Sequence, residues 1–288
     1  MGTSAPSTPP SGAHPLVPAW VSDEHPIDLP EDERDIGGRP VPAPVDARRF
    51  SSARRQMTSA IRLSSTGGGS GTAAGGGRRP ARTPRDRVRK AVQHYVSALG
   101  GSRGVVNRLG LAVDVGARLF QVLDRVAREG LEAALKAFGR SLDEQSAGAV
   151  ADALMTLVCE DTALGLEGVL DESMARAACD ETFIGLYEQG IRIADLKPEQ
   201  VADVIRAFAI NAACLMITRD IASSLVDRPR TEEEARSLQS TLESVIASSM
   251  RLELPTVDGA PYTIREVRDA ISAAYNDAFR ILGAGRDV

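Results

Sequence analysis

The sequence predicts an all-α protein, a helical bundle of about seven to eight helices preceded by a long disordered N-terminal arm. After residue 82, apolar residues recur at the 3.6-residue period of an amphipathic helix through most of the chain. Several of these segments open with a hydroxyl residue followed three positions later by an acid, which is typical of a helix start. Twelve of the sixteen prolines lie at or before Pro84. We therefore expect a flexible arm and Gly-rich linker over residues 1–82 and an α-helical body over 83–288.

The arm consists of successive segments whose compositions are each typical of disorder. It is rich in Pro and Ser up to Trp20, the only tryptophan, and then becomes acidic. The acidic residues are Asp23, Glu24, Asp28, Glu31, Asp32, Glu33 and Asp35. Residues 47–63 are basic, and we expect them to form a weak amphipathic helix only against a partner or the body. The glycine run over 67–77 predicts a flexible linker.

The body is expected to begin with a helix at Thr83, where a hydroxyl cap precedes Pro84, and to pause at Gly100 and Gly101. The next predicted helix covers residues 102–126 and contains Gly104, Gly110 and Gly116. Such small residues would let another helix or a peptide approach closely, and ordinary helix packing is the simpler explanation.

The later helices follow from the same signals. We expect helices over residues 131–138, 141–158, 166–187 (with a break near Asp171) and 197–217. The last of these is apolar nearly all round and should lie buried at the centre of the bundle. Thr231 and Thr263 open two further helices, each with a glutamate three residues later. Residues 251–262 between them are predicted to form a loop rather than a hairpin.

Composition and charge suggest where the protein works. The net charge of −5 gives no general affinity for nucleic acids or anionic membranes. The three cysteines are odd in number, widely spaced and set in apolar patterns, which is typical of buried thiols in a reducing compartment. No apolar run is long enough for a signal peptide or a membrane span. We therefore expect a cytoplasmic protein without a membrane partner.

The search for chemistry gives no motif for catalysis, a metal or a cofactor. The three histidines, His14, His25 and His94, precede most of the body. Neither a zinc-protease pattern nor a phosphate-binding loop, a C-x-x-C pair or a nucleophile elbow is present. We therefore predict a protein that is not an enzyme and holds neither a cofactor nor a metal.

One basic cluster has two interpretations. It contains Arg78, Arg79, Arg82, Arg85, Arg87, Arg89 and Lys90. The cluster could follow the phosphates of a nucleic acid, as in an adaptor protein. Alternatively it could contact the acidic segment of the chain itself or an acidic partner. The second interpretation is favoured because no aromatic residues are interleaved with the cations.

The N-terminal tail carries the most distinctive features. Gly2 is small enough for Met1 to be removed, which would leave a free glycine amine. N-myristoylation is excluded because Pro6 stands where its pattern needs Ser or Thr. Leu16, Val17, Pro18 and Trp20 form a short apolar patch that could dock on a partner.

Three stretches together resemble the QatB family of Qat anti-phage defence systems. They are Met1-Gly2-Thr3-Ser4, Pro15-Leu16-Val17-Pro18-Ala19-Trp20 and Leu99-Gly100-Gly101-Ser102-Arg103-Gly104. The resemblance implies a bacterial defence protein that acts with an ATPase (QatA), a QueC-like enzyme (QatC) and a TatD-like nuclease (QatD). It also implies that the QueC-like enzyme attaches a deazaguanine-type group to the N-terminal glycine. Here that residue would be Gly2, with Thr3 and Ser4 entering the same site.

Overall fold

The computed structural model describes residues 47–65, 83–140, 146–159, 168–222, 231–253 and 262–284. All regular secondary structure in these ranges is helical, which confirms the all-α prediction. The first helices are η2 (Ala47–Phe50), α1 (Ser51–Ser65), α2 (Pro84–Ala98), α3 (Ser102–Arg108), α4 (Gly110–Glu129) and α5 (Leu131–Ala137). The later ones are α6 (Ala147–Cys159), α7 (Gly168–Glu188), η4 (Ile193–Asp195), α8 (Pro198–Ala222), α9 (Glu232–Ala247) and α10 (Ile264–Gly283).

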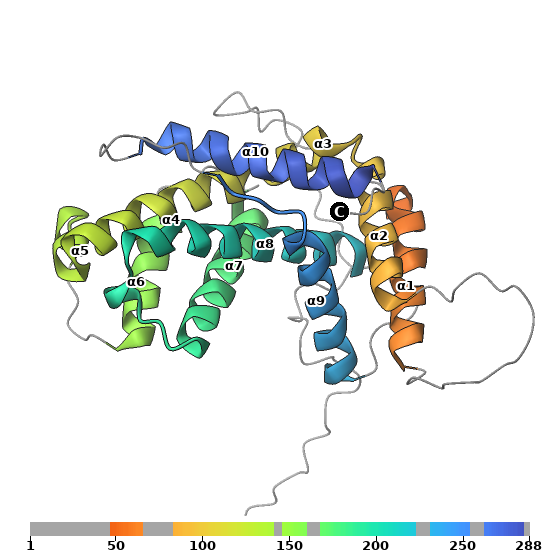
Figure 1. Cartoon of the computed structure of the whole chain (residues 1–288), viewed down its shortest axis with the longest axis horizontal. Helices are drawn as coiled ribbons and strands as arrows, with labels where there is room; N and C mark the ends of the chain where they lie inside the picture. The colour runs from red at the N-terminus through yellow and green to blue at the C-terminus, as the bar shows by residue number, and fades with distance from the viewer. Residues whose placement is uncertain are drawn as a thin grey trace, which may run out of the picture. The chain divides into compact units, whose positions relative to one another are not determined.

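Helix α8 forms the centre of the bundle, as its apolar sequence predicts. It packs against α4, α7 and α9, and Ile205, Phe208 and Ile217 on it are fully buried. Among the described residues, only Pro198–Ile221 is long and apolar enough to cross a membrane, and 61% of its most apolar window is buried within the protein. Figure 1 shows α5 and α6 at one end of α4 and the pair α1 and α2 at the opposite end of the bundle.

Helices α4, α8 and α10 approach one another closely at Gly116. A Cβ atom on this glycine would lie 3.1 Å from both Phe208 Cε1 of α8 and Ile271 Cδ1 of α10. Nearby, the Tyr275 hydroxyl donates a hydrogen bond of 2.9 Å to the Ala209 carbonyl oxygen, which satisfies a fully buried phenol. Ordinary helix packing therefore explains the small residue at this position.

Two predicted helix boundaries are wrong. The single helix expected over 102–126 is divided at Leu109, whose N–H bonds to the carbonyls of both Val105 and Val106. Gly110 follows directly and lowers the cost of leaving the helical path. The body after residue 82 therefore has nine described α-helices, α2 to α10. Helix α7 runs through Asp171 without the expected break.

Helix α1 belongs to the body and runs antiparallel to α2. The Phe50 ring at its start stacks on Tyr95, with 4.9 Å between ring centroids, and Arg49 Nε donates to the Ala98 carbonyl oxygen. Further along, Arg87 Nη1 donates to Gln56 Oε1 at 3.1 Å. The apolar face of α1, including Met57, is buried. The helical body thus includes residues 47–65, ahead of the start expected at residue 83, while residues 1–46 and 66–82 lie outside the described part.

The turn between α2 and α3 explains the glycines of its sequence motif. Gly100 and Gly101 adopt φ values of +83° and +98°, which favour glycine. A Cβ atom on Gly104 would lie 1.8 Å from the Leu99 carbonyl oxygen. The backbone of the turn therefore leaves no room for a side chain at residue 104.

We predict that Gly104→Ala lowers the free energy of unfolding by about 1–3 kcal/mol, because the added methyl group displaces backbone atoms. Gly110→Ala is the matched control: a Cβ there meets no atom within 4 Å. Its stability should be unchanged or raised by up to about 1 kcal/mol, the helix preference of Ala over Gly. Urea unfolding followed by circular dichroism measures both. Equal stability of the two variants would contradict the close approach at Gly104.

Candidate functional site

A buried ionic cluster in the described part centres on the Asp220 carboxylate, near the end of α8. Its Oδ2 accepts a 2.8 Å hydrogen bond from the Tyr95 hydroxyl of α2, and its Oδ1 lies 3.3 Å from Arg108 Nη2 of α3. Arg219 Nε is 3.8 Å from the same Oδ1. The Asp220 side chain is only 7% exposed, so these partners replace most of its hydration. The contacts join three helices that are far apart in the sequence.

The electrostatics of this cluster favour a structural role. Burial, assisted by the negative charge of Asp220 and the hydrogen bond to it, raises the pKa of Tyr95 far above its ordinary value. Arg108 and Arg219 oppose that shift and offset it only in part. Tyr95 therefore remains a protonated donor at any physiological pH. The phenol donor and the two guanidinium groups hold the Asp220 side chain between three helices.

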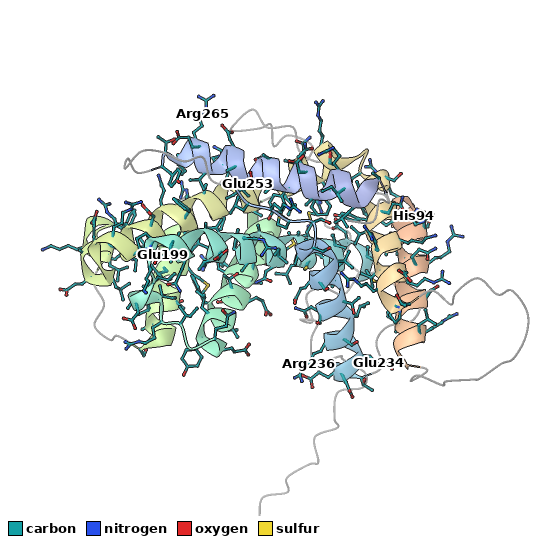
Figure 2. The ribbon with its side chains drawn as sticks, in the orientation of Figure 1. His94, Glu199, Glu234, Arg236, Glu253 and Arg265 are labelled. Atoms are coloured by element: carbon teal, nitrogen blue, oxygen red, sulfur yellow. The ribbon has the colours of Figure 1, made fainter. Side chains whose placement is uncertain are left out.

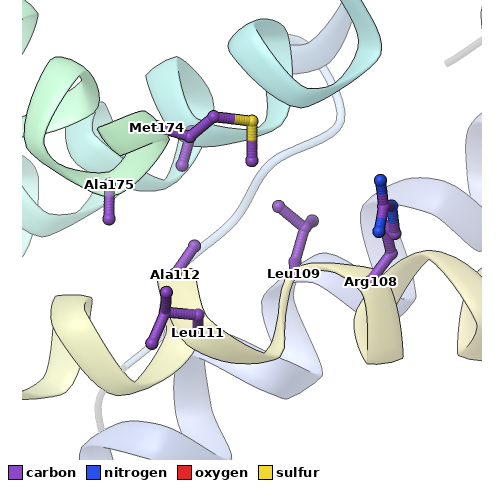
Figure 3. Close-up of a pocket in the computed structure, with 7 residues that line it drawn as sticks. Arg108, Leu109, Leu111, Ala112, Met174 and Ala175 are labelled. Atoms are coloured by element: carbon purple, nitrogen blue, oxygen red, sulfur yellow. The ribbon is translucent and has the colours of Figure 1, made fainter. Parts of the chain in front are cut away.

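The cavity beside this cluster is too small for a substrate. It has a volume of about 10 Å³, and Figure 3 shows its mainly apolar lining with Arg108 at one side. The lining residues are Arg108, Leu109, Leu111, Ala112, Met174, Ala175 and Ala212. Such a volume holds about one water molecule. The cavity is therefore a packing defect between α3, α4, α7 and α8.

Other reactive groups in the described residues are buried or scattered. No cluster of three or more His, Cys, Asp or Glu side chains in these ranges could hold a metal ion. Cys179 and Cys214 are buried and form no disulfide, and burial raises the pKa of the Cys214 thiol. A protonated, inaccessible thiol is a poor nucleophile.

Most of the residues that the sequence singles out lie outside the described part. They are Gly2, Thr3, Ser4, Leu16, Val17, Pro18, Trp20, Arg78, Arg79 and Arg82. The structure places Arg85, Arg87, Arg89 and Lys90 on α2. Arg85 is exposed and the other three are partly buried.

The structure adds a second row of cations that the sequence does not connect with the first. Helix α1 carries Arg54, Arg55 and Arg62 and packs beside α2. We call the joint surface the α1–α2 basic face: Arg54, Arg55, Arg62, Arg85, Arg87, Arg89 and Lys90. Figure 2 shows side chains with nitrogen tips projecting outward along these two helices, with His94 near one end. Residues 66–82 separate the two helices in the sequence, so local patterns do not predict that α1 packs on α2. The amphipathic spacing of α1 indicates only that this helix needs a partner.

The described part thus defines a helical protein with a packed apolar core and a buried ionic cluster. A family model described as Qat anti-phage system associated protein QatB matches residues 100–282, well over half of the chain. The chain belongs to the QatB family, whose members are components of an anti-phage defence system. The match continues far beyond residue 104, where the resembling motifs end, and it leaves residues 1–99 uncovered. No curated protein and no solved structure matches the chain.

We predict that Tyr95→Phe lowers the free energy of unfolding by about 1.5–3 kcal/mol, the range for a hydrogen bond to a charged group. The change removes one donor from a carboxylate that is 7% exposed and keeps the stacking with Phe50. Tyr187→Phe is the control, because Tyr187 is 69% exposed and should change stability by less than about 0.5 kcal/mol. Chemical unfolding measures both, and a Tyr95→Phe effect no larger than the control would contradict the role of the cluster.

Proposed function

We propose that this chain is the protein substrate of the QueC-like enzyme of its Qat system, QatC, which attaches a deazaguanine-type group to Gly2 after Met1 is removed. The observation that carries the proposal is membership of the QatB family together with the Met1-Gly2-Thr3-Ser4 sequence. The cavity described above, with about 10 Å³, suits a protein that is acted upon better than one that holds a small substrate.

The chemistry of amines supports Gly2 as the acceptor. An α-amino group has a pKa of about 7.7–8.0, against about 10.4 for lysine, so roughly 25–40% of it is an uncharged nucleophile at pH 7.5. About 0.1% of a lysine side chain is uncharged at that pH. The chain has three lysines, Lys90, Lys136 and Lys197. At neutral pH, the difference in pKa alone therefore favours reaction at the α-amine over reaction at a lysine, without any selective contact from the enzyme.

The apolar patch of Leu16, Val17, Pro18 and Trp20 supplies a docking element in this proposal. Leu16 lies fourteen positions after Gly2, a distance of at most about 50 Å when the chain is extended. The patch can therefore bind outside the active site of the enzyme while Gly2, Thr3 and Ser4 enter it. Pro15, directly before the patch, and Pro18, within it, reduce the conformational entropy lost on binding.

The remaining partners follow from the same family context. We propose that the helical body, through its exposed surfaces, joins the ATPase QatA and the TatD-like nuclease QatD, and that the assembly works in the cytoplasm. The chain acts in it as a non-enzymatic component without a cofactor.

We predict a mass increase at Gly2 when the chain is expressed with its QueC-like partner, and none when it is expressed alone. Intact-mass measurement followed by peptide fragmentation locates the added group. In Gly2→Pro the second residue stays small, so Met1 is still removed, but the α-nitrogen becomes a hindered ring amine and the adduct should be lost. Ser7→Ala, five residues further along, should keep it. An unmodified N-terminus in the presence of every partner gene would sink the proposal.

We predict that Trp20→Ala lowers kcat/KM for modification at least tenfold, mainly through KM, because an aromatic anchor at an interface contributes about 2 kcal/mol or more. Leu29→Ala, an apolar truncation in the same arm outside the patch, serves as the control and should change the rate less than twofold. The initial rate of adduct formation against substrate concentration gives both constants. Equal effects of the two variants would show that the patch does not dock.

A further inference from the structure

The α1–α2 basic face is a concentrated positive surface in an acidic chain. Helices α1 and α2 together contain seven Arg and Lys residues and a single acid, Asp86, whereas the whole chain has a net charge of −5. The Asp86 carboxylate is already used at the start of α2, where it accepts hydrogen bonds of 2.9 Å from both the N–H and the hydroxyl of Thr83. The two helices therefore carry a large excess of positive over negative side chains.

The spacing of the exposed cations suits a repeating anion. Arg55 and Arg62 are exposed on α1 and seven residues apart, so their Cα atoms stand about 10.5 Å apart along the helix. Arg85 is exposed on α2. Six of the seven cations are arginines, whose planar guanidinium groups match phosphate oxygens in a bidentate manner.

The face lacks what a protein partner would use. Interfaces between proteins depend on a few buried aromatic or apolar anchors. On the described residues of α1 and α2, Leu63 is the only exposed large apolar side chain, at 40%. The aromatic residues of this region, Phe50 and Tyr95, are buried against each other. Cations without such anchors favour a polyanion over an acidic protein surface, which reverses the preference for an acidic partner that the sequence alone indicated.

The lack of exposed aromatic rings on the described part of α1 and α2 also favours a duplex over a single-stranded nucleic acid. Proteins that bind single strands stack the bases on exposed aromatic rings. A duplex presents its phosphates outward and needs only cations and hydrogen-bond donors for binding that is independent of sequence. We propose that the α1–α2 basic face binds the phosphate backbone of double-stranded nucleic acid. This function is separate from the modification of Gly2 and does not depend on it.

The test measures binding of the full-length protein to a fluorescein-labelled 20-base-pair DNA by fluorescence anisotropy between 50 and 300 mM salt. The variant Arg55→Gln, Arg62→Gln, Arg85→Gln should bind at least tenfold more weakly at the lowest salt. Its plot of log K against log salt should be less steep by about 2–3, since each lost phosphate contact accounts for about 0.9. All three side chains are exposed, and a cation at the start of α2 opposes the helix dipole, so the fold should be retained. Circular dichroism and thermal unfolding check this.

The control variant is Arg192→Gln, Arg236→Gln, Arg280→Gln, which removes the same charge from side chains that are 68%, 76% and 68% exposed on other elements. It should bind within about twofold of the unaltered protein. Equal weakening by the two triple variants, or no duplex binding at 50 mM salt, would overturn the proposal.

Two competitors separate the alternative partners. Unlabelled duplex should displace the labelled DNA at a concentration at least tenfold lower than polyglutamate of equal total charge. If polyglutamate competes equally well, the face is a site for an acidic protein and the proposal is wrong. If a single strand of the same length competes better than the duplex, the assignment to double-stranded nucleic acid is wrong.

Discussion

The buried Asp220 carboxylate is the constraint on which the arrangement of the first helices depends. It lies in the last turn of α8, where the helix dipole disfavours a negative charge, and burial adds the cost of lost hydration. Tyr95 and Arg108 compensate for both only if α2 and α3 hold their positions against α8. The ionic cluster therefore adds specificity to helix packing that apolar contacts alone would leave less defined. Phe50 stacks on Tyr95 and extends the same constraint to the start of α1.

Local sequence signals predicted the helices well because each signal acts within a few residues. Thr83 and Thr263 form the expected reciprocal caps with Asp86 and Glu266, and the hydroxyl of Thr231 accepts from the Glu234 N–H. Hydrogen bonds from the N–H and the hydroxyl of Thr263 lower the pKa of Glu266, as expected for a carboxylate that caps a helix. The nearly continuous apolar sequence of α8 likewise predicted its central place.

The features that sequence reasoning missed depend on distant pairs. In the sequence, nothing marks Asp220 as different from any other acidic residue near the end of a helix. Only the fold brings Tyr95, 125 residues away, within hydrogen-bonding distance of it. The basic residues of α1 and α2 were considered as two separate segments, because nothing in the linker between them indicates that the helices pack side by side. The division at Leu109 was missed for a different reason: one glycine inside an apolar repeat is compatible with either a continuous or an interrupted helix.

The part of the chain that the family model matches and the part that carries the two proposed activities meet near residue 100. The match begins at residue 100, whereas Gly2, the apolar patch around Trp20 and the α1–α2 basic face all precede it. The matched part is a packed bundle in which Gly104 and Gly116 leave no room for larger residues. This core holds α2 and α3 against α8 through Tyr95, Arg108 and Asp220. The proposed modification site, the proposed docking patch and the proposed nucleic-acid face therefore all lie ahead of the part of the chain that the family model covers.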